Sequence, residues 1–426
     1  MIATQHKLMQ LFDSAVKAAL PQHCLAPHLP APPTGGRLII LAAGKGTSAM
    51  VRAAEAHYLD ASPPVPIEGI GVTRNGFALP TRVIPLIEAG HPVPDANSVR
   101  AAKAVLELAS GAGEKDTVLV LLSGGASALW TAPVEGVTLE EKQAVTRGLL
   151  KSGAPIGEIN CVRRHLSRIK GGRLALAASP ARVITLAISD VPRDEPAAIG
   201  SGPTVGDPTT LADARAILRN RRVSVPASVT AALSREENET PDPASNIFAR
   251  TNFALIARPA GSLEAAACTA RDMGYAVRLL GDSLEGEARD VARDHAALAI
   301  EALKRGERLA LLSGGELTVT IRGEGRGGPN QEYALAVALA IAGQKGISGL
   351  AADTDGTDGG SGAADDPAGA LFDASTVERA APLRLEPAKF LENNDSTGFF
   401  EKLGDLIICG PTHTNVNDFR AILVDP

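Results

Sequence analysis

Short continuous apolar runs alternate along this chain with alanine-rich stretches of helical spacing. Four of the runs end in glycine or polar residues: RLIILAAGKG (37–46), DTVLVLLSGG (116–125), VITLAISDV (183–191) and RLALLSGG (308–315). Such runs are typical of strands buried on both faces of a sheet. The stretches between them predict helices, one of which starts with a capping box at Thr138 and Glu141. This alternation predicts an α/β fold with mainly parallel sheets covered by helices.

The stretch REENETPDPASN, residues 235–246, divides the pattern into two halves. It is charged, contains proline and has almost no apolar side chains, which is typical of a linker. A chain of 426 residues is also long enough for more than one domain. We therefore expect two α/β domains, residues 1–238 and 239–426. In the second domain, the alternating β-branched residues of LTVTIRG (317–323) predict a strand that pairs antiparallel to its neighbour.

The sequence Leu-Leu-Ser-Gly-Gly occurs twice, at 121–125 and 311–315, each time at the end of a predicted buried strand. Ligands of α/β sheets bind beyond the carboxyl ends of strands. The repeat therefore indicates one local device used once in each domain, with a single cleft between the domains that is lined from both sides. The alternative is chance combined with common turn chemistry.

Composition narrows the class of protein. A formal net charge of -6 argues against nucleic acid as a partner. The four cysteines are too widely spaced for a zinc site or a disulfide framework. No apolar run is long enough to predict a membrane span. We expect a soluble cytoplasmic protein.

The loop AAGKGTSAM, residues 42–50, is the first candidate for chemistry. Gly44 and Gly46 follow a buried strand and precede a helix, so their backbone amides could bind an anion, and Lys45 adds a positive charge. The loop does not fit a Walker A motif, but Gly44, Gly46 and Ala49 fit the dinucleotide fingerprint, with Glu68 as the ribose ligand. The alternative is a tight turn with a solvated lysine.

Two further segments offer anion ligands. The small residues Ser123, Gly124, Gly125 and Ser127 supply hydroxyls and amides, although the spacing does not match the Gly-x-Ser-x-Gly motif of serine hydrolases. Residues 160–175, NCVRRHLSRIKGGRLA, concentrate basic side chains that could clamp a carboxylate or a phosphate. The alternative is a solvated basic helix face. The basic candidates are Arg163, Arg164 and Lys170.

Acidic and charged loops complete the inventory. Asp190 lies at the end of a predicted strand, from which a carboxylate could bind metal or act as a base. In the segment SGGELTVTIRGEGRGGPNQE, Arg326 lies on a glycine-rich loop and could stabilise charge during phosphoryl transfer. The stretch DTDGTDGG could bind Mg²⁺ through oxygen, or simply form turns. Its carboxylates are those of Asp353, Asp355 and Asp358.

Seven of these motifs, taken in order, resemble those of the class II glycerate 2-kinases, which carry a C-terminal MOFRL domain. They are AAGKGTSAM, LLSGGASAL, NCVRRHLSRIKGGRLA, ISDVPRDEPAAIGSGPTVGDPTT, SGGELTVTIRGEGRGGPNQE, AADTDGTDGGSGAA and PTHTNVNDFRAILV. The resemblance implies ATP- and Mg²⁺-dependent phosphorylation of glycerate, typically to 2-phosphoglycerate. It also implies a glycerate kinase N-terminal domain (1–238), a MOFRL-type domain (239–426) and an active site in the cleft between them, with Lys45 and Arg326 as catalytic residues.

The expected roles follow from this resemblance. Arg163, Arg164 or Lys170 and the Ser-Gly-Gly amides would hold the carboxylate of glycerate, and Asp190 would orient or deprotonate its C2 hydroxyl. Mg²⁺ would bridge the ATP phosphates through Asp190 or the loop of Asp353, Asp355 and Asp358. Further ligands are expected in the second domain, at Ser313, Gly314, Gly315, Glu316 and Asn330.

Two other functions stay open. A hydroxypyruvate reductase that uses NAD(P)H is the first, because many members of this family carry that label. A non-enzymatic binder of small carboxylates is the second. No nucleic acid or membrane partner is expected, and the sequence leaves a homodimer open as the assembly.

Overall fold

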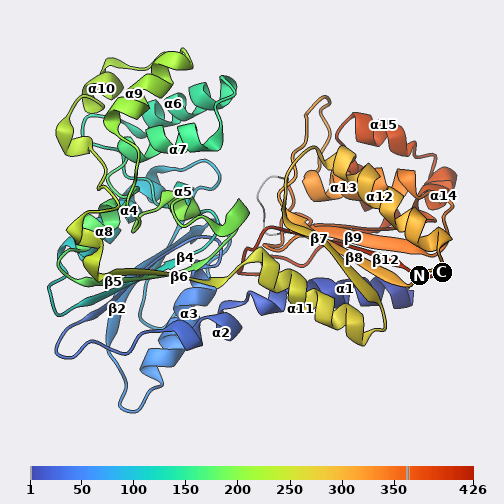
Figure 1. Ribbon diagram of the computed structural model, residues 1–426, viewed down its shortest axis with the longest axis horizontal. Coiled ribbons are helices and arrows are strands. Elements are labelled where there is room, and N and C mark those ends of the chain that lie inside the picture. The colour runs from blue at the N-terminus through green and yellow to red at the C-terminus, as the bar shows by residue number, and fades with distance from the viewer. Residues whose placement is uncertain (1, 361–362, 364) are drawn as a thin grey trace. The chain divides into compact units, whose positions relative to one another are not determined.

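The computed structural model describes residues 2–360, 363 and 365–426. The chain divides into two compact units (Figure 1). We call Cys24–Ser189 with Asp194–Ile256 the first unit. We call Met1–His23, Asp190–Arg193 and Ala257–Pro426 the second unit. The α/β class and the two-domain organisation are as predicted.

The first unit contains a six-stranded sheet in the order β3-β2-β1-β4-β5-β6. Its strands are β1 (Leu38–Ala43), β2 (Ile67–Arg74), β3 (Leu86–Ala89), β4 (Thr117–Leu122), β5 (Arg182–Ile188) and β6 (Thr251–Ala257). The pairs from β3 to β5 are all parallel, with Leu38 level with Thr117 and Thr117 level with Arg182. The carboxyl ends of these strands therefore meet at one edge, as expected for a parallel α/β sheet.

The helices of the first unit form two groups. They are α3 (Thr47–Leu59), α4 (Ala96–Ser110), α5 (Ala126–Leu129), α6 (Leu139–Lys151), α7 (Ile156–His165), α8 (Arg173–Ala178), α9 (Leu211–Asn220) and α10 (Ala227–Ala232). Figure 1 shows α6, α7, α9 and α10 gathered away from the sheet. These four helices pack on one another through a separate apolar cluster that includes Val145, Leu149, Val162 and Leu218. The predicted capping box at Thr138 and Glu141 starts α6.

The second unit has a six-stranded sheet in the order β11-β10-β9-β12-β8-β7. Its strands are β7 (Ala276–Leu284), β8 (Leu309–Gly315), β9 (Ile347–Asp353), β10 (Gly369–Asp373), β11 (Leu406–Ile407) and β12 (Asp418–Val424). Only β7 and β8 pair in parallel, because β12 runs antiparallel between β8 and β9, and β10 runs antiparallel to β9 and β11. The expectation of mainly parallel strands thus applies to the first sheet, whereas the second sheet is mixed.

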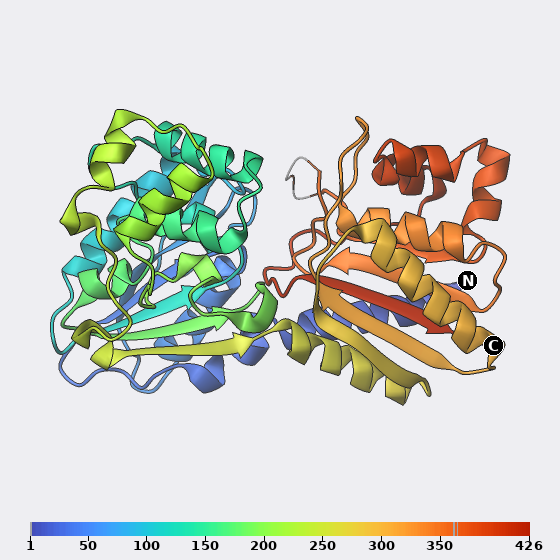
Figure 2. The same cartoon turned by 45° about the horizontal axis from the view of Figure 1, so that its top comes forward.

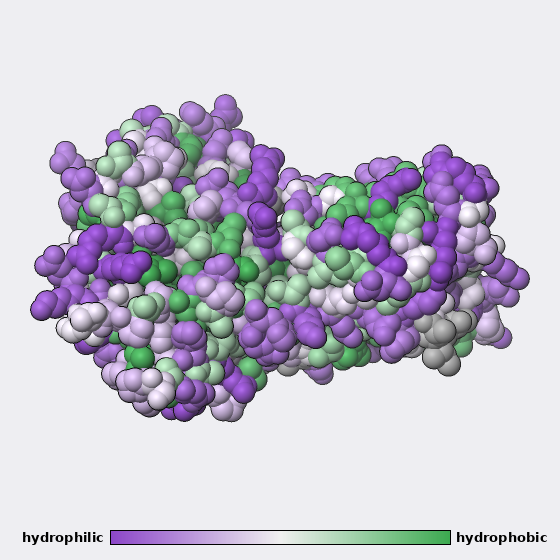
Figure 3. Space-filling model, turned by 60° about the horizontal axis from the view of Figure 1, so that its bottom comes forward, coloured by the Kyte–Doolittle hydropathy of each residue, from purple (hydrophilic) through white to green (hydrophobic). Residues whose placement is uncertain are grey.

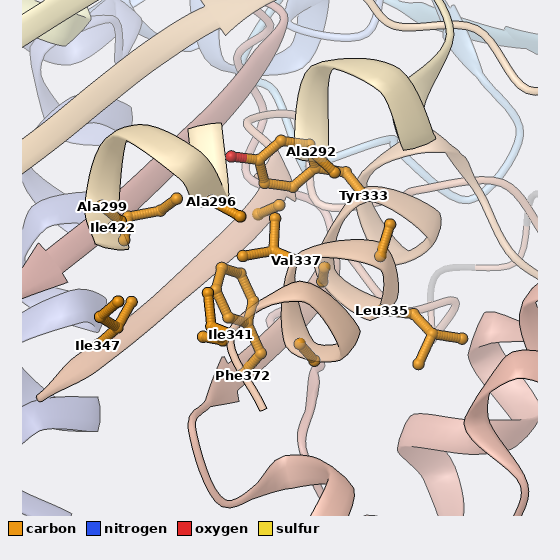
Figure 4. Packing of buried hydrophobic residues seen from close by; sticks show 14 of the residues in the cluster. Ala292, Ala296, Ala299, Tyr333, Leu335, Val337, Ile341, Ile347, Phe372 and Ile422 are labelled. Atoms are coloured by element: carbon orange, nitrogen blue, oxygen red, sulfur yellow. The ribbon is translucent and has the colours of Figure 1, made fainter. Parts of the chain in front are cut away.

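Helices cover both faces of this second sheet (Figures 1 and 2). They are α1 (Ile2–Ala18), α11 (Pro259–Asp272), α12 (Ala288–Lys304), α13 (Pro329–Ala340), α14 (Thr376–Ala380), α15 (Pro387–Glu392) and α16 (Ser396–Leu403), while the short α2 (Pro21–Cys24) follows α1. Successive residues of β8 face opposite sides, so Leu309 and Leu311 pack against α12 and α13, and Ala310 and Leu312 against α1 and α11. Figure 4 shows the first of these two cores, built around Tyr333 and Val337 of α13.

Two predictions about the chain between these elements differ from the structure. The segment 317–323 is not a strand: apart from a single parallel bridge between Glu287 and Thr318, it is a loop, and Ile321 is 80% exposed. Residues 235–246 are packed into the first unit rather than linking two domains, because Thr240 is bonded to the buried His165 and Asp207. The chain passes to the second unit at Ile256–Ala257, beyond the expected boundary at 238/239.

The surface is mostly hydrophilic in the face drawn in Figure 3, with hydrophobic residues in small patches. Large exposed apolar side chains lie on separate segments, for example Val93, Ile156, Ile321 and Ile408. Within the described part of the chain, no helix is both long and apolar enough to cross a membrane.

Candidate active site

The loop of Gly44, Lys45 and Gly46 joins β1 to α3 and is bonded to the end of the neighbouring strand β4. The amide of Lys45 donates to the carbonyl of Gly124 over 2.8 Å, and the amide of Gly46 donates to Ser123 Oγ over 2.9 Å. Gly44 has φ 133°, and a Cβ on it would lie 2.1 Å from Ser123 Oγ. Three of the predicted anion-binding residues are therefore engaged with one another, so the loop offers a ligand the Lys45 side chain rather than these two amides.

Lys45 and His91 flank the glycine that follows β4. A Cβ on Gly125 would lie 3.0 Å from His91 Cδ2 and 3.6 Å from Lys45 Cγ, and the φ of Gly125 is 88°. Both side chains belong to half-buried residues at the carboxyl edge of the first sheet. His91 was missed in the sequence, where it follows the short strand β3 (Leu86–Ala89) without any motif that marks it.

The dinucleotide fingerprint lacks its acidic partner. Glu68 is the second residue of β2 and pairs in register with Ile39 near the start of β1. A ribose ligand has to stand at the carboxyl end of β2, beside the glycine loop. Glu68 lies at the opposite edge, where Arg37 contacts it over 3.0 Å. The assignment of Glu68 as a ribose ligand is therefore wrong.

Ser127 lies in α5, just after the first Ser-Gly-Gly. Basic side chains of the segment 160–175 contact its hydroxyl. Arg163 Nη2 donates to Ser127 Oγ over 2.7 Å, and Ser201 Oγ lies 2.8 Å from the same oxygen. Lys170 Nζ is 3.1 Å from Ser127 Oγ, 2.6 Å from Ser127 O and 3.1 Å from Trp130 O. The structure thus brings together three of the predicted ligands, Ser127, Arg163 and Lys170.

The basic segment is part of the interior and not a solvated helix face. Lys170 is 1% exposed and Arg164 is 9% exposed. Arg164 pairs with the buried Asp207 over 3.0 Å and donates to the carbonyl of Ala197 over 2.7 Å. Arg164 therefore has a structural partner, and Asp207, which the sequence did not single out, is that partner.

Buried basic side chains gather around Ser127. Burial lowers the pKa of Lys170 and Lys142 far below the usual lysine value, and the neighbouring Arg163 guanidinium lowers both further. Burial also lowers the pKa of Arg163. Among the described residues, no carboxylate forms a hydrogen bond or ion pair with Lys142 or Lys170, which donate to carbonyl oxygens and to Ser127. An anion at this position would meet the Arg163 guanidinium, which has no carboxylate partner among the described residues.

In the second unit, Asp358 caps the start of α13. Its carboxylate accepts the backbone and side-chain N–H groups of Asn330 over 3.0 and 3.1 Å, and those of Gln331 over 2.8 and 3.1 Å. Burial and the nearby Asp418 raise the pKa of Asp358 to about 7. Both carboxylate oxygens accept hydrogen bonds from the start of α13, so Asp358 is poorly placed as the expected Mg²⁺ ligand.

Asn330 links this cap to the end of β8. Its Nδ2 also donates to Asp418 over 2.6 Å, and Asp418 pairs with Arg420. Arg420 donates to the carbonyls of Gly314 and Gly315 over 3.0 and 3.3 Å. The second Ser-Gly-Gly is thus held by an arginine, whereas the first is held by the Lys45 loop. The hypothesis of one device used twice is therefore wrong.

In the described part of the chain, buried polar atoms of this network without a hydrogen-bond partner include Arg420 Nε and two others. The two others are Asn330 Oδ1 and Ser313 Oγ, on residues that are 0% and 1% exposed. Buried polar groups are normally paired, so such atoms are candidates to contact a bound molecule or water. Asp418 and Arg420, which belong to the same network, were missed because they stand in an apolar strand whose partner strands could not be known.

The remaining acidic candidates do not form a metal cluster. Asp190 accepts from Asn415 Nδ2 over 2.9 Å, Asp355 accepts from the Thr357 amide over 2.7 Å, and Asp353 accepts from the Asp355 amide over 2.9 Å. Within the ranges 2–360, 363 and 365–426, no three His, Cys, Asp or Glu side chains are arranged to hold a metal. Residues 361, 362 and 364 of the AADTDGTDGGSGAA motif lie outside the described residues.

Arg326 and Glu316 are exposed residues of the loop between β8 and α13. Arg326 Nη2 contacts Glu401 over 3.0 Å, and both side chains are more than 60% exposed. An ion pair in this setting contributes little stability and is easily exchanged for another partner. The Arg326 amide donates to Asp395 over 3.1 Å, which ties the loop to the start of α16. The guanidinium is therefore accessible to an anion while its backbone is held.

Comparisons with known proteins agree with the resemblance seen in the motifs. A family model described as a domain of unknown function, DUF4147, matches residues 7–234, and a model described as the MOFRL family matches residues 309–418. A putative hydroxypyruvate reductase of Agrobacterium vitis is 45% identical over 99% of this chain and 95% of its own length.

Two further relatives come from Thermotoga maritima. A protein named D-glycerate 2-kinase is 40% identical over 95% of this chain and 93% of its own length. A crystal structure of a glycerate kinase superposes with a TM-score of 0.87 at 37% identity, with both chains covered in full. The DUF4147 match alone spans more than half of the 426 residues. The chain therefore belongs to the glycerate kinase family whose members combine a DUF4147 domain with a MOFRL domain.

Proposed function

We propose that this chain is a glycerate 2-kinase that transfers the γ-phosphoryl group of ATP to the 2-hydroxyl of glycerate, with Mg²⁺, to give 2-phosphoglycerate. The observation that carries the proposal is the Arg163 guanidinium, which contacts Ser127 and has no carboxylate partner among the described residues, with Lys45 at the same edge of the first sheet. Glycerate and ATP are both anions. The relatives named glycerate kinase at 40% and 37% identity support the same substrate.

The roles of the first-unit residues follow from their exposure. Arg163 and Ser127 are only partly buried, and we propose that they contact the carboxylate of glycerate. Lys170 and Arg164 are buried behind them and hold Ser127 and the loop at Ala197 in place. Lys45 is proposed to neutralise charge on the transferring phosphoryl group.

The second unit is proposed to act on the same reaction through Arg326. Phosphoryl transfer depends on positioning and on cationic groups that stabilise the transferring oxygens. The accessible guanidinium of Arg326 fits that role, because its present partner, Glu401, is itself an exposed carboxylate. Ser313, Gly314, Gly315, Glu316 and Asn330 remain proposed phosphate ligands of this unit.

Mg²⁺ fits part of the predicted acidic set. Magnesium commonly uses one or two carboxylates together with substrate phosphates and water. Asp190, Asp353 and Asp355 are the carboxylates proposed for that part, whereas both oxygens of Asp358 accept hydrogen bonds from the start of α13. When bound, the ion would supply charge neutralisation to the phosphates. The residues of this chain would orient the hydroxyl of glycerate, with Asp190 held by Asn415 as the proposed base.

A reductase is the second candidate, because the A. vitis relative at 45% identity bears that name. The geometry argues against it, since Glu68 lies at the wrong edge of the sheet to bind a ribose. The two activities separate in one pair of assays. A kinase consumes ATP with glycerate, whereas a reductase oxidises NAD(P)H with hydroxypyruvate.

The kinase assignment is tested with Lys45→Ala and Arg326→Ala. Each change removes a cation from the transferring phosphoryl group, so kcat should fall by about 100-fold or more. The matched control is Arg322→Ala, which removes another exposed arginine from the same loop and should leave kcat unchanged. Near-normal kcat in both test variants would show that these roles are wrong.

We also propose a cytoplasmic location, with glycerate and a nucleotide as the ligands. The four cysteines are all unbridged in the structure, which suits a reducing compartment.

A further inference from the structure

The hydroxyl of Ser127 is contacted by a buried amine to which the proposed kinase reaction gives only a positioning role. Lys170 Nζ lies 3.1 Å from Ser127 Oγ and also contacts two backbone carbonyls, those of Ser127 and Trp130. Carbonyl oxygens only accept hydrogen bonds, so two N–H groups of Nζ point at them. The third contact of Nζ is the serine hydroxyl.

The contacts of Ser127 Oγ agree with a neutral amine at Lys170. A neutral amine has two N–H groups and one lone pair. With both N–H groups given to carbonyls, the lone pair faces Ser127 Oγ and accepts its proton. The serine oxygen then has two lone pairs for its other neighbours, Arg163 Nη2 at 2.7 Å and Ser201 Oγ at 2.8 Å. Every donor in this arrangement meets an acceptor.

Electrostatics separates this arrangement from the one with a charged lysine. Lys170 is 1% exposed, and in the part of the chain that the structure describes no carboxylate pairs with it. The charged groups that act on it are Arg163, Lys142 and Arg164, all cations that disfavour a further positive charge. Burial without a counter-ion disfavours the ammonium form as well. Lys170 is therefore an amine able to accept a proton.

We propose that Ser127 and Lys170 form a nucleophile–base pair that hydrolyses small anionic esters. Ser127 Oγ attacks the ester carbonyl while its proton passes to Lys170 Nζ, and Lys170 then returns the proton to the departing alkoxide. The acyl group remains on Ser127 until a water molecule, deprotonated by Lys170, attacks its carbonyl. The bond to Ser127 Oγ then breaks, Lys170 returns the proton to this oxygen, and the acid is released. Serine with a lysine base is an established alternative to serine with histidine.

Arg163 selects the class of ester. Its guanidinium is 2.7 Å from the attacking oxygen and has no carboxylate partner within the described residues, so an ester with a carboxylate close to its carbonyl should be preferred over a neutral one. Ser127 is half-buried, whereas Lys170 lies fully in the interior. The Gly-x-Ser-x-Gly motif is absent, so a search for hydrolase motifs does not find this serine.

The pair is tested with a small alkyl fluorophosphonate, which bonds to activated serines with loss of fluoride. Peptide mapping by mass spectrometry should place one adduct on Ser127 and none on the exposed Ser224 of the same unit. Lys170→Arg keeps N–H donors at this position but is always protonated and provides no base near neutral pH, so labelling should slow by about 100-fold or more. Equal labelling rates in the wild type and Lys170→Arg would overturn the proposal.

A measurement on the unmodified protein guards against misfolding of the variant. The labelling rate should reach its plateau at a pH well below that at which an ordinary lysine loses its proton, and should fall only when acid protonates Lys170. A rate that instead rises up to pH 10, as for an ordinary lysine, would overturn the proposal. In steady state, the p-nitrophenyl monoester of succinic acid should be hydrolysed at least 10-fold more efficiently than neutral p-nitrophenyl acetate, and the reverse preference would refute the role of Arg163.

These readouts need neither ATP nor glycerate. Failure of labelling would leave the kinase assignment intact, and failure of the kinase assay would leave the serine–lysine pair intact.

Discussion

Replacing Gly44 by alanine tests the close approach of the Lys45 loop to the end of β4. Gly44 has φ 133°, a conformation that costs other residues about 1–3 kcal/mol. The new Cβ would also lie 2.6 Å from Ser123 O and 2.7 Å from Ser123 C, which are backbone atoms and cannot rotate away. We expect strain and clash together to lower the free energy of unfolding of the first unit by about 3–5 kcal/mol.

Two other glycines of the same unit separate the contributions. Gly153 has φ 68° with nothing within 4 Å of a Cβ, so alanine there should cost only about 1 kcal/mol of backbone strain. Gly157 lies in α7 with a negative φ and open space, and alanine there should stabilise the unit by roughly 0.5 kcal/mol. The expected order of stability is Gly157→Ala, wild type, Gly153→Ala, Gly44→Ala.

The single tryptophan makes this order measurable. Trp130 is 2% exposed in the first unit, so its fluorescence during urea unfolding reports on that unit and not on the other. The midpoints and slopes of the three variants and the wild type give the differences in free energy. Equal losses for Gly44→Ala and Gly153→Ala would refute the claim that contact with Ser123, and not φ alone, requires glycine at position 44.

Three further predictions concern single side chains. Burial and Arg420 lower the pKa of His295 to about 4, below its unfolded value of 6.5. The second unit should therefore lose stability as the pH falls from about 6.5 to 4. His295→Gln should remove that loss, which urea unfolding followed by circular dichroism measures. Asp207→Ala leaves Arg164 buried without its carboxylate and should cost about 3–5 kcal/mol, measured by Trp130 fluorescence. Asn415→Ala removes the amide that donates to Asp190 and should lower kcat of the kinase reaction by about 10-fold with KM for ATP unchanged. An unchanged kcat would contradict a positioning role for Asn415.

The sequence predicted those parts of the fold whose apolar residues can be buried in only one type of structure. The runs that became β1, β4, β5 and β8 are apolar at nearly every position, and only strands covered on both faces bury such runs. The closeness of Lys45 and Ser123 also follows, because neighbouring parallel strands end at the same edge.

Strand direction and long-range partners could not be predicted in this way. The run that forms β12 is equally apolar whether it pairs parallel or antiparallel, so the mixed order of the second sheet is invisible in its residues. Asp418 and Asp207 act only through Arg420 and Arg164, and a single buried carboxylate has no spacing that marks it. The alternating residues 317–323 mimic a strand because the period of two is necessary for a half-buried strand but does not supply a partner.

Helix α1 belongs to the second unit although nearly the whole first unit separates it from α11 along the chain. Its Leu8, Leu11 and Phe12 fill the core beneath β8, β9 and β12. These residues are synthesised first, but the core that buries them is complete only after β12 has been synthesised. Expressing residues 257–426 alone would leave an apolar surface uncovered. Lys7 Nζ and Asp425 Oδ2 lie 4.0 Å apart. A short peptide joining residues 426 and 1 would therefore allow the second unit, apart from Asp190–Arg193, to be expressed as one continuous chain.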